Sequence, residues 1–365
     1  MTKTIRIDLG DRSYDVQIGP GLRKQAGSFL QVAGHVSSVA VISDSNVSSL
    51  YGQDVLHALS AAGYPASLLT FPAGENHKTL ATCGDLYDRL FSLQPAMDRS
   101  SVIVALGGGV TGDMAGFVAA TFLRGIRFVQ VPTSLLADVD ASAGGKTGID
   151  HPAGKNLIGA FHQPAGVLVD VDTLKTLPAE ELRSGLAECV KHAVIRDADL
   201  LDYIESRASD LLACEEGSLS ELIARNVAIK AAVVSQDERE AGLRAILNYG
   251  HTFGHAIEAA AGFGNITHGQ AVALGMVAAN SVAVARDWLD AADADRVEAV
   301  LVQLGLETRR AGLDAIDLHR RMLHDKKTRD GKIKFLLPTR LGEVRIVDDL
   351  SEAEIYAGIG YLQQG

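Results

Sequence analysis

The chain has 365 residues, of which 47% are hydrophobic and 22% are charged, so it is long enough to form two globular domains. Its formal net charge of -11 argues against nucleic acid as a partner, because nucleic-acid binding needs a basic surface. Its three cysteines form neither a disulfide framework nor a Cys-x-x-Cys metal motif, which favours a reducing, cytoplasmic location. The N-terminal sequence MTKTIRIDLG lacks the apolar segment of a signal peptide. The most membrane-like run, 271–285, contains polar residues and predicts a buried helix, so we expect no membrane span.

The first half of the chain alternates strands and helices, which predicts an α/β domain with a parallel sheet. The strands are expected at 5–9, 14–18, 39–43, 66–71, 101–106, 127–132 and 166–174. The third of them ends at Asp44, which either caps the helix that follows or accepts hydrogen bonds from a ribose, and the sequence leaves both open. Glu75 and Lys78 lie in the loop after the fourth strand, before a helix expected from about 79 to 93.

A glycine motif follows the strand at 101–106. Gly107, Gly109 and Gly112 match the pattern Gly-x-Gly-x-x-Gly and open a helix of small residues. Glycines let the backbone approach a pyrophosphate, and the start of the helix supplies amide donors, so this context favours a nucleotide. The motif departs from the usual dinucleotide pattern, because no acidic residue ends the next strand and Asp44 lies upstream.

The segment 133–161 is rich in glycine, and we expect a tight loop there. It carries Asp138, Asp140, Lys146, Lys155 and Asn156. The Gly-Lys-Thr at 145–147 is not a P-loop, because Asp140 stands where that motif needs its first glycine. Its lysines suit a phosphate or a carboxylate, and charges of a solvated loop are the alternative.

From about Pro178 the pattern becomes mainly helical. Helices are expected at 179–195, 198–206, 218–236, 245–261, 269–288, 292–304, 314–324 and 351–362, with a short hairpin around Gly342. The sequence therefore predicts an α/β domain of the nucleotide-binding kind at 1–177 and a helical domain at 178–365. We expect the chemistry in the cleft between them.

Three of the eleven histidines lie close together in the second domain. His251 and His255 are four residues apart and share a helix face, and His268 opens the next helix after a turn. With a carboxylate such as Glu188, two histidines and an open position form a catalytic metal site of the zinc type. The spacing leaves open whether His255 or His268 is the second ligand, and ordinary helix histidines are the alternative. The pair lacks the Glu of a His-Glu-x-x-His peptidase.

The chain resembles the 3-dehydroquinate synthase family from end to end. The resemblance rests on ALGGGVTGDMAGF, LRGIRFVQVPTSLLADVDASAGGKTGIDHPAGKNLIGAF, GLAECVKHAVI, SQDEREAGLRAILNYGHTFGHAIE, THGQAVALGM and the DKK at 325–327. It implies a Rossmann-like NAD-binding domain followed by a mainly α-helical domain that binds metal and substrate. It also implies that one divalent metal, Zn or Co, is held by Glu188, His251 and His268, which makes His255 a substrate-side residue.

The resemblance further implies roles for residues in both domains. The NAD-binding positions fall on Asp44, Asn46, Glu75, Lys78, Gly108, Gly109, Asp113, Thr133, Ser134, Lys155 and Thr176. The catalytic positions fall on Asp140, Lys146, Lys191, Arg244, Asn248 and His255, and further substrate-binding positions on Arg124, Asn156, Lys230, Glu240 and Lys326. Arg124 is similar to a family arginine that reaches into the neighbouring subunit, which implies a homodimer. Ser134 replaces the usual Thr, and Gln270 replaces the usual Glu, which removes one negative charge near the metal.

The implied substrate is a phosphorylated sugar acid, 3-deoxy-D-arabino-heptulosonate 7-phosphate. The implied reaction is a transient oxidation of its C5 hydroxyl by NAD, elimination of phosphate, reduction, and ring closure by an aldol step to 3-dehydroquinate. One alternative is a related cyclase that uses sedoheptulose 7-phosphate, which lacks the carboxylate; the intact cationic set around Lys230 and Arg244 argues against it. The other is a metal-dependent polyol dehydrogenase of the glycerol dehydrogenase type, which would release NADH.

Overall fold

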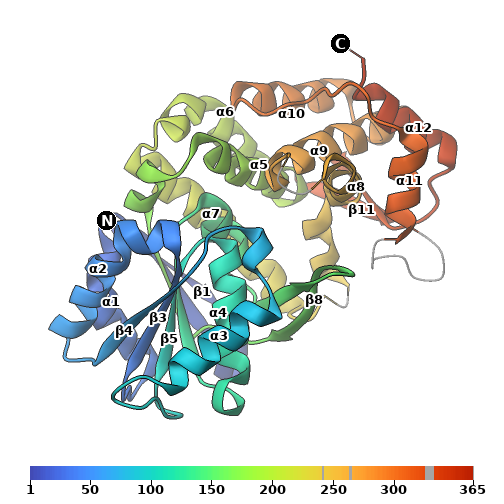
Figure 1. Ribbon diagram of the computed structural model, residues 1–365. Coiled ribbons are helices and arrows are strands. Elements are labelled where there is room, and N and C mark those ends of the chain that lie inside the picture. The colour runs from blue at the N-terminus through green and yellow to red at the C-terminus, as the bar shows by residue number, and fades with distance from the viewer. Residues whose placement is uncertain (241, 263–264, 325–332, 365) are drawn as a thin grey trace. The chain divides into compact units, whose positions relative to one another are not determined.

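The computed structural model describes residues 1–240, 242–262, 265–324 and 333–364 (Figure 1). By its contacts the chain divides into two units, Met1–Leu177 with Leu219–Arg239, and Pro178–Ser218 with Glu240–Gly365. The first unit is Rossmann-like and the second is mainly helical, which confirms the predicted fold class. One break falls at Leu177, whereas the segment Leu219–Arg239 belongs to the first unit. The assignment of NAD binding and metal binding to two domains stays a prediction.

The first unit is built on a seven-stranded sheet with the order β1-β2-β9-β6-β5-β3-β4. Its strands are β1 (Lys3–Ile7), β2 (Tyr14–Gly19), β3 (Val39–Asp44), β4 (Ala66–Phe71), β5 (Val102–Gly107), β6 (Arg127–Pro132) and β9 (Val167–Asp170). All neighbouring pairs are parallel except β1 and β2, which pair antiparallel. The strand positions expected from the sequence agree with these bounds to within a few residues, except that β9 is shorter.

Helices cover both faces of this sheet. They are α1 (Ala26–Phe29), α2 (Ser45–Ala61), α3 (Leu80–Phe91) and α4 (Gly109–Thr121), and the part of α7 (Glu216–Gln236) from Leu219 onward belongs to the same unit. Ile42 and Ile103 pack in a core with residues of α3 and α4, whereas Val41 and Val104 pack in a second core with residues of α1 and α2. Neighbours along a strand point to opposite faces, so continuous apolar strands feed both cores.

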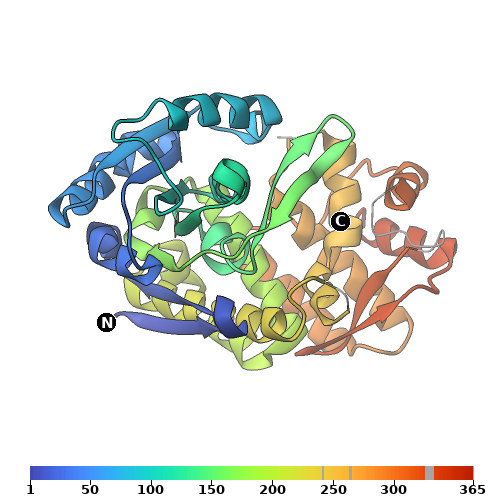
Figure 2. The same ribbon diagram turned by 90° about the horizontal axis from the view of Figure 1, so that it is seen from below.

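The glycine-rich segment 133–161 is not the tight loop that its composition predicted. It contains a single π-turn, Ala137–Ala141, and an antiparallel hairpin of β7 (Lys146–His151) and β8 (Gly154–Phe161), which extends away from the main sheet (Figure 2). Thr147 and Ile149 are buried, and Ile149 belongs to the core that contains α3 and α4. Packing of Ile149, with Ile158 and Ala160 beside the same core, therefore stabilises the hairpin, although its glycines are typical of loops.

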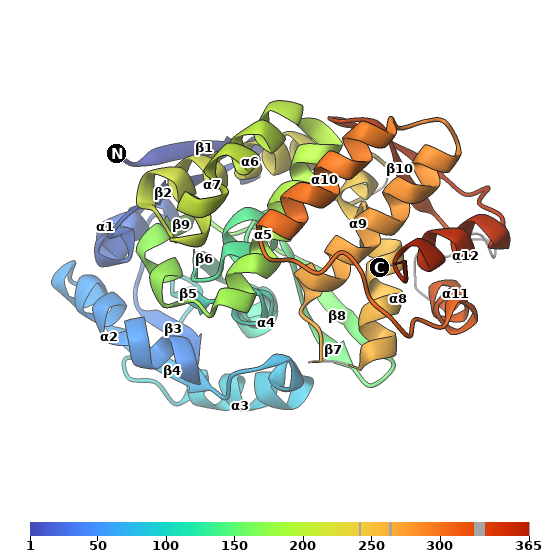
Figure 3. The ribbon, with the colours of Figure 1, turned by 90° about the horizontal axis from the view of Figure 1, so that it is seen from above.

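The second unit surrounds one apolar helix, α9. Its helices are α5 (Ala179–Arg196), α6 (Ala198–Leu212), α8 (His251–Ala261), α9 (His268–Ala285), α10 (Ala291–Gln303), α11 (Ala315–His324) and α12 (Glu352–Tyr361). A hairpin of β10 (Phe335–Arg340) and β11 (Glu343–Val347) completes it. Helix α9 contacts α5, α8, α10 and α12 (Figure 3), which explains why it is buried almost all round. No helix among the described residues has both the length and the apolar character to span a membrane.

The predicted helix 245–261 is interrupted. Residues Leu243–Asn248 form a 3-10 turn, and α8 begins only at His251. Gly250 between them has a φ of 79°, a left-handed conformation that ends one helical segment before the next begins. His251 consequently stands at the first position of α8 rather than in the middle of a longer helix.

Two glycines set the distances between the helices that carry the histidines and Glu188. A Cβ atom at Gly269 of α9 would lie 2.2 Å from the carbonyl oxygen of Ser184 on α5. A Cβ atom at Gly275 of α9 would lie 1.9 Å from the carbonyl oxygen of Gly250, next to α8. Only hydrogen fits at these positions, so α9 lies unusually close to both α5 and the start of α8.

Candidate metal and nucleotide sites

Two histidines converge on one buried carboxylate in the second unit. Glu188 of α5 is fully buried, and its Oε1 lies 3.7 Å from Nε2 of His251 and 3.4 Å from Nε2 of His268. The ring of His255, one turn along α8, lies 5.2 Å from the His251 ring and 5.8 Å from the His268 ring, measured between centroids. The three histidines each offer a nitrogen within 4.8 Å of the others. The side chains proposed from the sequence therefore meet in one small volume.

The other ring nitrogen of each of these two histidines faces an acceptor. Nδ1 of His251 lies 3.1 Å from the carbonyl oxygen of Tyr249, and Nδ1 of His268 lies 3.2 Å from Oε2 of Glu258. An acceptor opposite Nδ1 holds a proton there, so Nε2, the nitrogen that faces Glu188, is the one available to a metal. Both imidazoles are thus oriented as metal ligands usually are.

The protonation of the two histidines differs because their surroundings differ. Burial lowers the pKa of His251 well below its ordinary value, so this imidazole is neutral at pH 7. Burial also lowers the pKa of His268, but hydrogen bonds to Glu188 and Glu258 outweigh it and raise the pKa to about 9. Lys191 forms an ion pair with Glu188 from the next turn of α5. The carboxylate of Glu188 thus attracts positive charge from several sides.

This donor set fits a divalent metal. A buried carboxylate and two imidazole nitrogens on three helices are the ligands that Zn²⁺ and related ions take in catalytic sites. The distances from Glu188 to the imidazole nitrogens are short enough for one small cation to reach all three groups. The neutral state of His251 suits a ligand as well, because only an unprotonated imidazole nitrogen binds a metal.

Further predicted site residues lie just before α8. Arg244 is buried with 2% of its surface exposed, in a chain with a large negative net charge. Asn248 donates from Nδ2 to Oε1 of Glu240 at 2.8 Å. Glu240 has a φ of 58°, which is rare for a residue with a side chain. Lys326 lies outside the described residues.

In the first unit, the predicted nucleotide residues gather where the parallel strands end. Asp44 ends β3, Gly108 follows β5, and Thr133 follows β6. Asn46 lies in the first turn of α2, Glu75 and Lys78 follow β4, Gly109 and Asp113 lie in α4, Ser134 follows Thr133, and Thr176 ends the 3-10 helix after β9. Lys155 lies on β8 of the hairpin. Ligands of open α/β sheets bind at this carboxyl edge, and Gly107–Gly109 has the expected strand–turn–helix context.

Asp44 is the N-cap of α2, which was one of the two possibilities. Its Oδ1 accepts from the backbone N–H groups of Asn46 at 2.9 Å and Val47 at 3.1 Å. Its Oδ2 accepts from Oγ1 of Thr111 at 3.2 Å. The capping holds the carboxylate in place at the sheet edge. A contact with a ribose stays a prediction.

A buried lysine connects the hairpin to the nucleotide edge. Nζ of Lys78 donates to Oδ2 of Asp113 and to Oδ1 of Asn156, both at 2.6 Å. Although burial acts against its charge, the carboxylates of Asp113 and Glu75 raise the pKa of Lys78. Nζ of Lys155, on β8, lies 3.7 Å from Oε1 of Glu75. These residues form one charged cluster, and its internal contacts, including the one between Lys78 and Asn156, come from the structure alone.

A second lysine, on α7, contacts the π-turn within the first unit. Nζ of Lys230, which is 4% exposed, donates to the carbonyl and to Oδ1 of Asp140 in the π-turn. Lys146 starts β7 and is exposed. Arg124 is also exposed and has a φ of 69°, directly after Leu123 with a φ of 51°. Two such residues in succession are strained, which points to a functional reason for that conformation.

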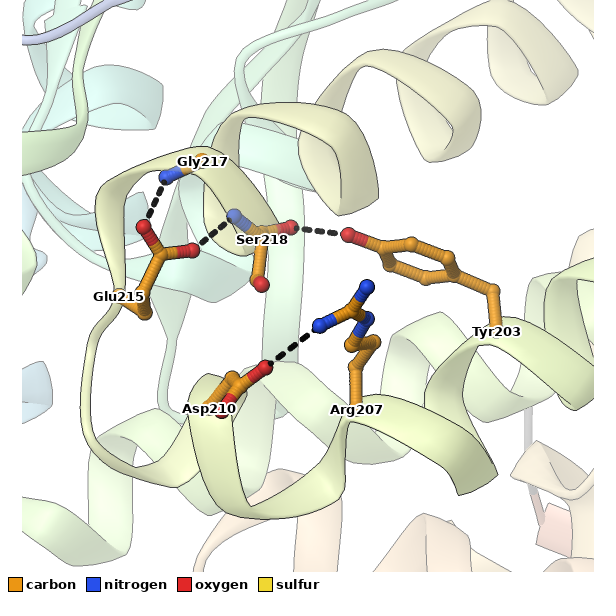
Figure 4. A pocket seen from close by; sticks show the side chains of 6 residues that line it. All are labelled: Tyr203, Arg207, Asp210, Glu215, Gly217 and Ser218. Atoms are coloured by element: carbon orange, nitrogen blue, oxygen red, sulfur yellow. Dashed lines mark hydrogen bonds and ion pairs between the residues drawn. The ribbon is translucent and has the colours of Figure 1, made fainter.

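A surface pocket of about 470 Å³ lies elsewhere, between α6 and the start of α7 (Figure 4). Glu215 accepts from the backbone N–H groups of Gly217 and Ser218, and Tyr203 donates to the carbonyl of Ser218. Arg207 forms an ion pair with Asp210. The residues of this pocket bind one another and cap α7, so it is a structural junction.

Two contacts in the second unit were not foreseen from the sequence. Glu258, beside His268, follows His251 by seven residues and His255 by three, and this helical spacing is the signal that could have identified it. Gln270 accepts from the backbone N–H of Thr267 at 3.1 Å, and Thr267 in turn caps α9. Its side chain therefore forms a capping box, which the motif Thr-x-x-Gln encodes.

Two solved structures with this fold are sugar phosphate cyclases with NAD⁺ and a divalent metal bound. The 2-epi-5-epi-valiolone synthase from Streptomyces hygroscopicus, with NAD⁺ and Zn²⁺ bound, is 30% identical with a TM-score of 0.88, and 97% of this chain and 98% of that chain are covered. A 2-deoxy-scyllo-inosose synthase complexed with carbaglucose-6-phosphate, NAD⁺ and Co²⁺ is 28% identical with a TM-score of 0.89, at 98% and 99% coverage.

The sequence comparisons are more specific. Residues 68–184 match the model of the 3-dehydroquinate synthase N-terminal region, and residues 185–328 match that of its C-terminal region. The 3-dehydroquinate synthase of Desulforamulus reducens is 46% identical over 355 residues, which cover 97% of this chain and 98% of the relative. The chain therefore belongs to the 3-dehydroquinate synthase family.

Proposed function

We propose that the chain converts 3-deoxy-D-arabino-heptulosonate 7-phosphate to 3-dehydroquinate and phosphate, a step in the synthesis of aromatic compounds. The observation that carries this proposal is the convergence of His251 and His268 on buried Glu188, in a chain that is 46% identical to a 3-dehydroquinate synthase along nearly its whole length. The alternative, a related cyclase whose substrate lacks the carboxylate, is less well supported, because the two solved cyclase structures are only 28% and 30% identical to this chain.

The proposed cofactors are NAD and one Zn²⁺ or Co²⁺. NAD would bind the carboxyl edge of the sheet through the residues gathered there, and the metal would be held by Glu188, His251 and His268. Bound NAD would supply reversible hydride acceptance for the transient oxidation, and the bound metal would supply polarisation of substrate hydroxyl oxygens. The acidic protein must itself supply local positive charge for a substrate with a phosphate and a carboxylate.

The protein's own groups would bind and orient that substrate. Arg244, Lys230 and Lys146 are the cations that we propose for the two anionic groups, together with Arg124, Asn156 and Lys326. Glu240 would hold Asn248 toward the substrate through the hydrogen bond between them. Asp140, Lys191 and His255 are proposed to hold or move protons, and the phosphate of the substrate can itself accept the proton that is removed before elimination.

The first test is phosphate release from the proposed substrate with NAD and Zn²⁺ or Co²⁺, before and after EDTA. We expect release that stops when EDTA removes the metal and returns when metal is added back, without accumulation of NADH at 340 nm. Turnover of sedoheptulose 7-phosphate instead would assign the chain to the carboxylate-free cyclases. Steady NADH accumulation with a simple polyol would show a dehydrogenase.

We also propose that the protein acts as a homodimer in the cytoplasm, where NAD and phosphorylated sugar acids are available. The strained backbone at Leu123 and Arg124 presents an exposed guanidinium, which suits a contact with the site of a second copy. Sedimentation of the purified chain as a monomer at working concentrations would contradict this part of the proposal.

Changing Gln270 to Glu should leave metal binding nearly unchanged. Either side chain can accept from the backbone N–H of Thr267, so the capping box survives, and a negative charge near the start of α9 adds about 0.3–1 kcal/mol of stability. We expect a Zn²⁺ dissociation constant within about threefold of the wild type, measured by competition with a chromogenic chelator. A change of tenfold or more would show that the charge at position 270 acts on the metal.

A further inference from the structure

We propose that Glu258 is a positioning residue of the metal centre, whose carboxylate orients the imidazole of His268 for ligation. The inference rests on the proposed function, because it takes His268 as a metal ligand. Glu258 is the last residue of the motif SQDEREAGLRAILNYGHTFGHAIE, but the resemblance assigns it no role as a ligand or as a catalytic, substrate-binding or NAD-binding residue.

The contact geometry supports this role. Glu258 lies on α8 and is only 8% exposed, and its Oε2 is 3.2 Å from Nδ1 of His268. The opposite ring nitrogen of His268 is 3.4 Å from Oε1 of Glu188. The imidazole therefore lies between two carboxylates. Glu188 faces Nε2, the proposed ligating nitrogen, and Glu258 faces Nδ1 on the opposite side of the ring.

Helix α8 carries both a proposed ligand and the residue that orients the other one. His251, His255 and Glu258 follow one another at spacings of four and three residues, so they lie along one helix face. The close approach at Gly275 holds α9 against the start of α8. The side chain of Glu258 can thus reach His268 across the helix interface without crossing open space.

A carboxylate behind a histidine changes its chemistry as a ligand. It fixes the proton on Nδ1, holds the ring plane, and makes the ligating nitrogen a stronger donor. His251 has a neutral backbone carbonyl from Tyr249 in the equivalent place. The two proposed imidazole ligands are therefore unequal, and loss of Glu258 should weaken the bond from His268 and leave His251 in place.

The test compares two substitutions of Glu258 with a matched control. Glu258→Ala removes the acceptor and the charge, Glu258→Gln keeps a neutral acceptor, and Glu180→Gln removes an exposed carboxylate from the start of α5. We expect the Zn²⁺ dissociation constant to rise 10- to 100-fold in Glu258→Ala, by a smaller factor in Glu258→Gln, and by less than twofold in the control. The visible absorption bands of bound Co²⁺ should shift in both Glu258 variants.

Folding and metal binding are measured separately, by circular dichroism of the metal-free variants and by chelator competition. A folded Glu258→Gln variant with an unshifted Co²⁺ spectrum, together with a Glu258→Ala variant of wild-type Zn²⁺ affinity, would overturn the inference. If the wild-type chain binds no metal, the proposed function fails. If the wild type binds metal and releases phosphate while the Glu258 variants match it, only the role of Glu258 fails.

Discussion

Replacing Gly269 with Ala is expected to destabilise the second unit by about 3 kcal/mol and to weaken metal binding at least tenfold. The added Cβ would lie 2.2 Å from the carbonyl oxygen and 2.4 Å from the Cα atom of Ser184, and neither backbone atom can turn aside as a side chain could. The backbone N–H of Gly269 also donates to Oγ of Ser184 at 2.9 Å. Helix α9 must therefore move away from α5.

The movement matters for the site because the same two helices carry two proposed ligands. His268 precedes Gly269 directly, and Glu188 follows Ser184 by one helical turn. Thermal or urea unfolding measures the stability, and Zn²⁺ competition measures the affinity. Gly360→Ala on α12 is the matched control, because nothing lies within 4 Å of its Cβ position, and it should stabilise by about 0.5–1 kcal/mol. Wild-type stability of Gly269→Ala would show that the two helices can separate freely.

Replacing Asp138 with Asn is expected to stabilise the protein increasingly as the pH rises. Asp138 lies in the π-turn with none of its surface exposed, and neither carboxyl oxygen has a hydrogen-bond partner among the described residues. Burial raises the pKa of Asp138 well above its ordinary value, and the nearby charge of Asp170 raises it further. The folded protein therefore keeps a proton on Asp138 that the unfolded chain releases above about pH 4.

The sign of the effect follows from that difference in bound protons. The contribution of Asp138 to the free energy of unfolding is fully present below the unfolded pKa and falls as the pH rises toward the folded pKa. Asn is neutral at every pH, so the variant and the wild type should be equal near pH 4. The variant should be more stable by an amount on the order of 2 kcal/mol at pH 8.

Urea unfolding between pH 4 and pH 8 measures this difference. Asp88→Asn, which removes an exposed carboxylate on α3 of the same unit, is the control and should follow the wild-type curve. If Asp138→Asn also follows that curve, then Asp138 is ionised in the folded protein and a compensating charge or water must reach it.

Helices and strands could be predicted from the sequence where a single local pattern of apolar and turn residues determines them. The strand at 39–43 and the glycine turn after 101–106 were placed correctly, because continuous apolar runs and turn residues determine them locally. The prediction of one helix over 245–261 was wrong in its first part. The helical spacing of apolar residues continues past Gly250, but the left-handed backbone of Gly250 interrupts the helix there. The hairpin of β7 and β8 was missed, because its glycines are typical of loops and its burial depends on a distant core.

For the candidate sites too, one part could be predicted from the sequence and another could not. The sequence identified the residue types and the family, since three histidines, a glycine motif and long matching segments are local features. It could not decide whether Asp44 caps a helix, because capping and ribose binding use the same residue at the same strand end. The roles of the individual site residues stay predictions that the variants above can test.

The sequence by itself determined the order of the elements, the α/β and helical parts, and the set of side chains capable of the chemistry. The family resemblance implied that Glu188, His251 and His268 share a metal, whereas the contacts that bring side chains together come from the tertiary structure. Glu188 and His268 are neighbours because the missing side chain of Gly269 lets α9 lie close to α5. Glu258 contacts His268 because α8 packs against α9. The segment Leu219–Arg239 belongs to the first unit, where Lys230 binds Asp140. Such contacts depend on distances between elements far apart in the chain, and local periodicity carries no information about those distances.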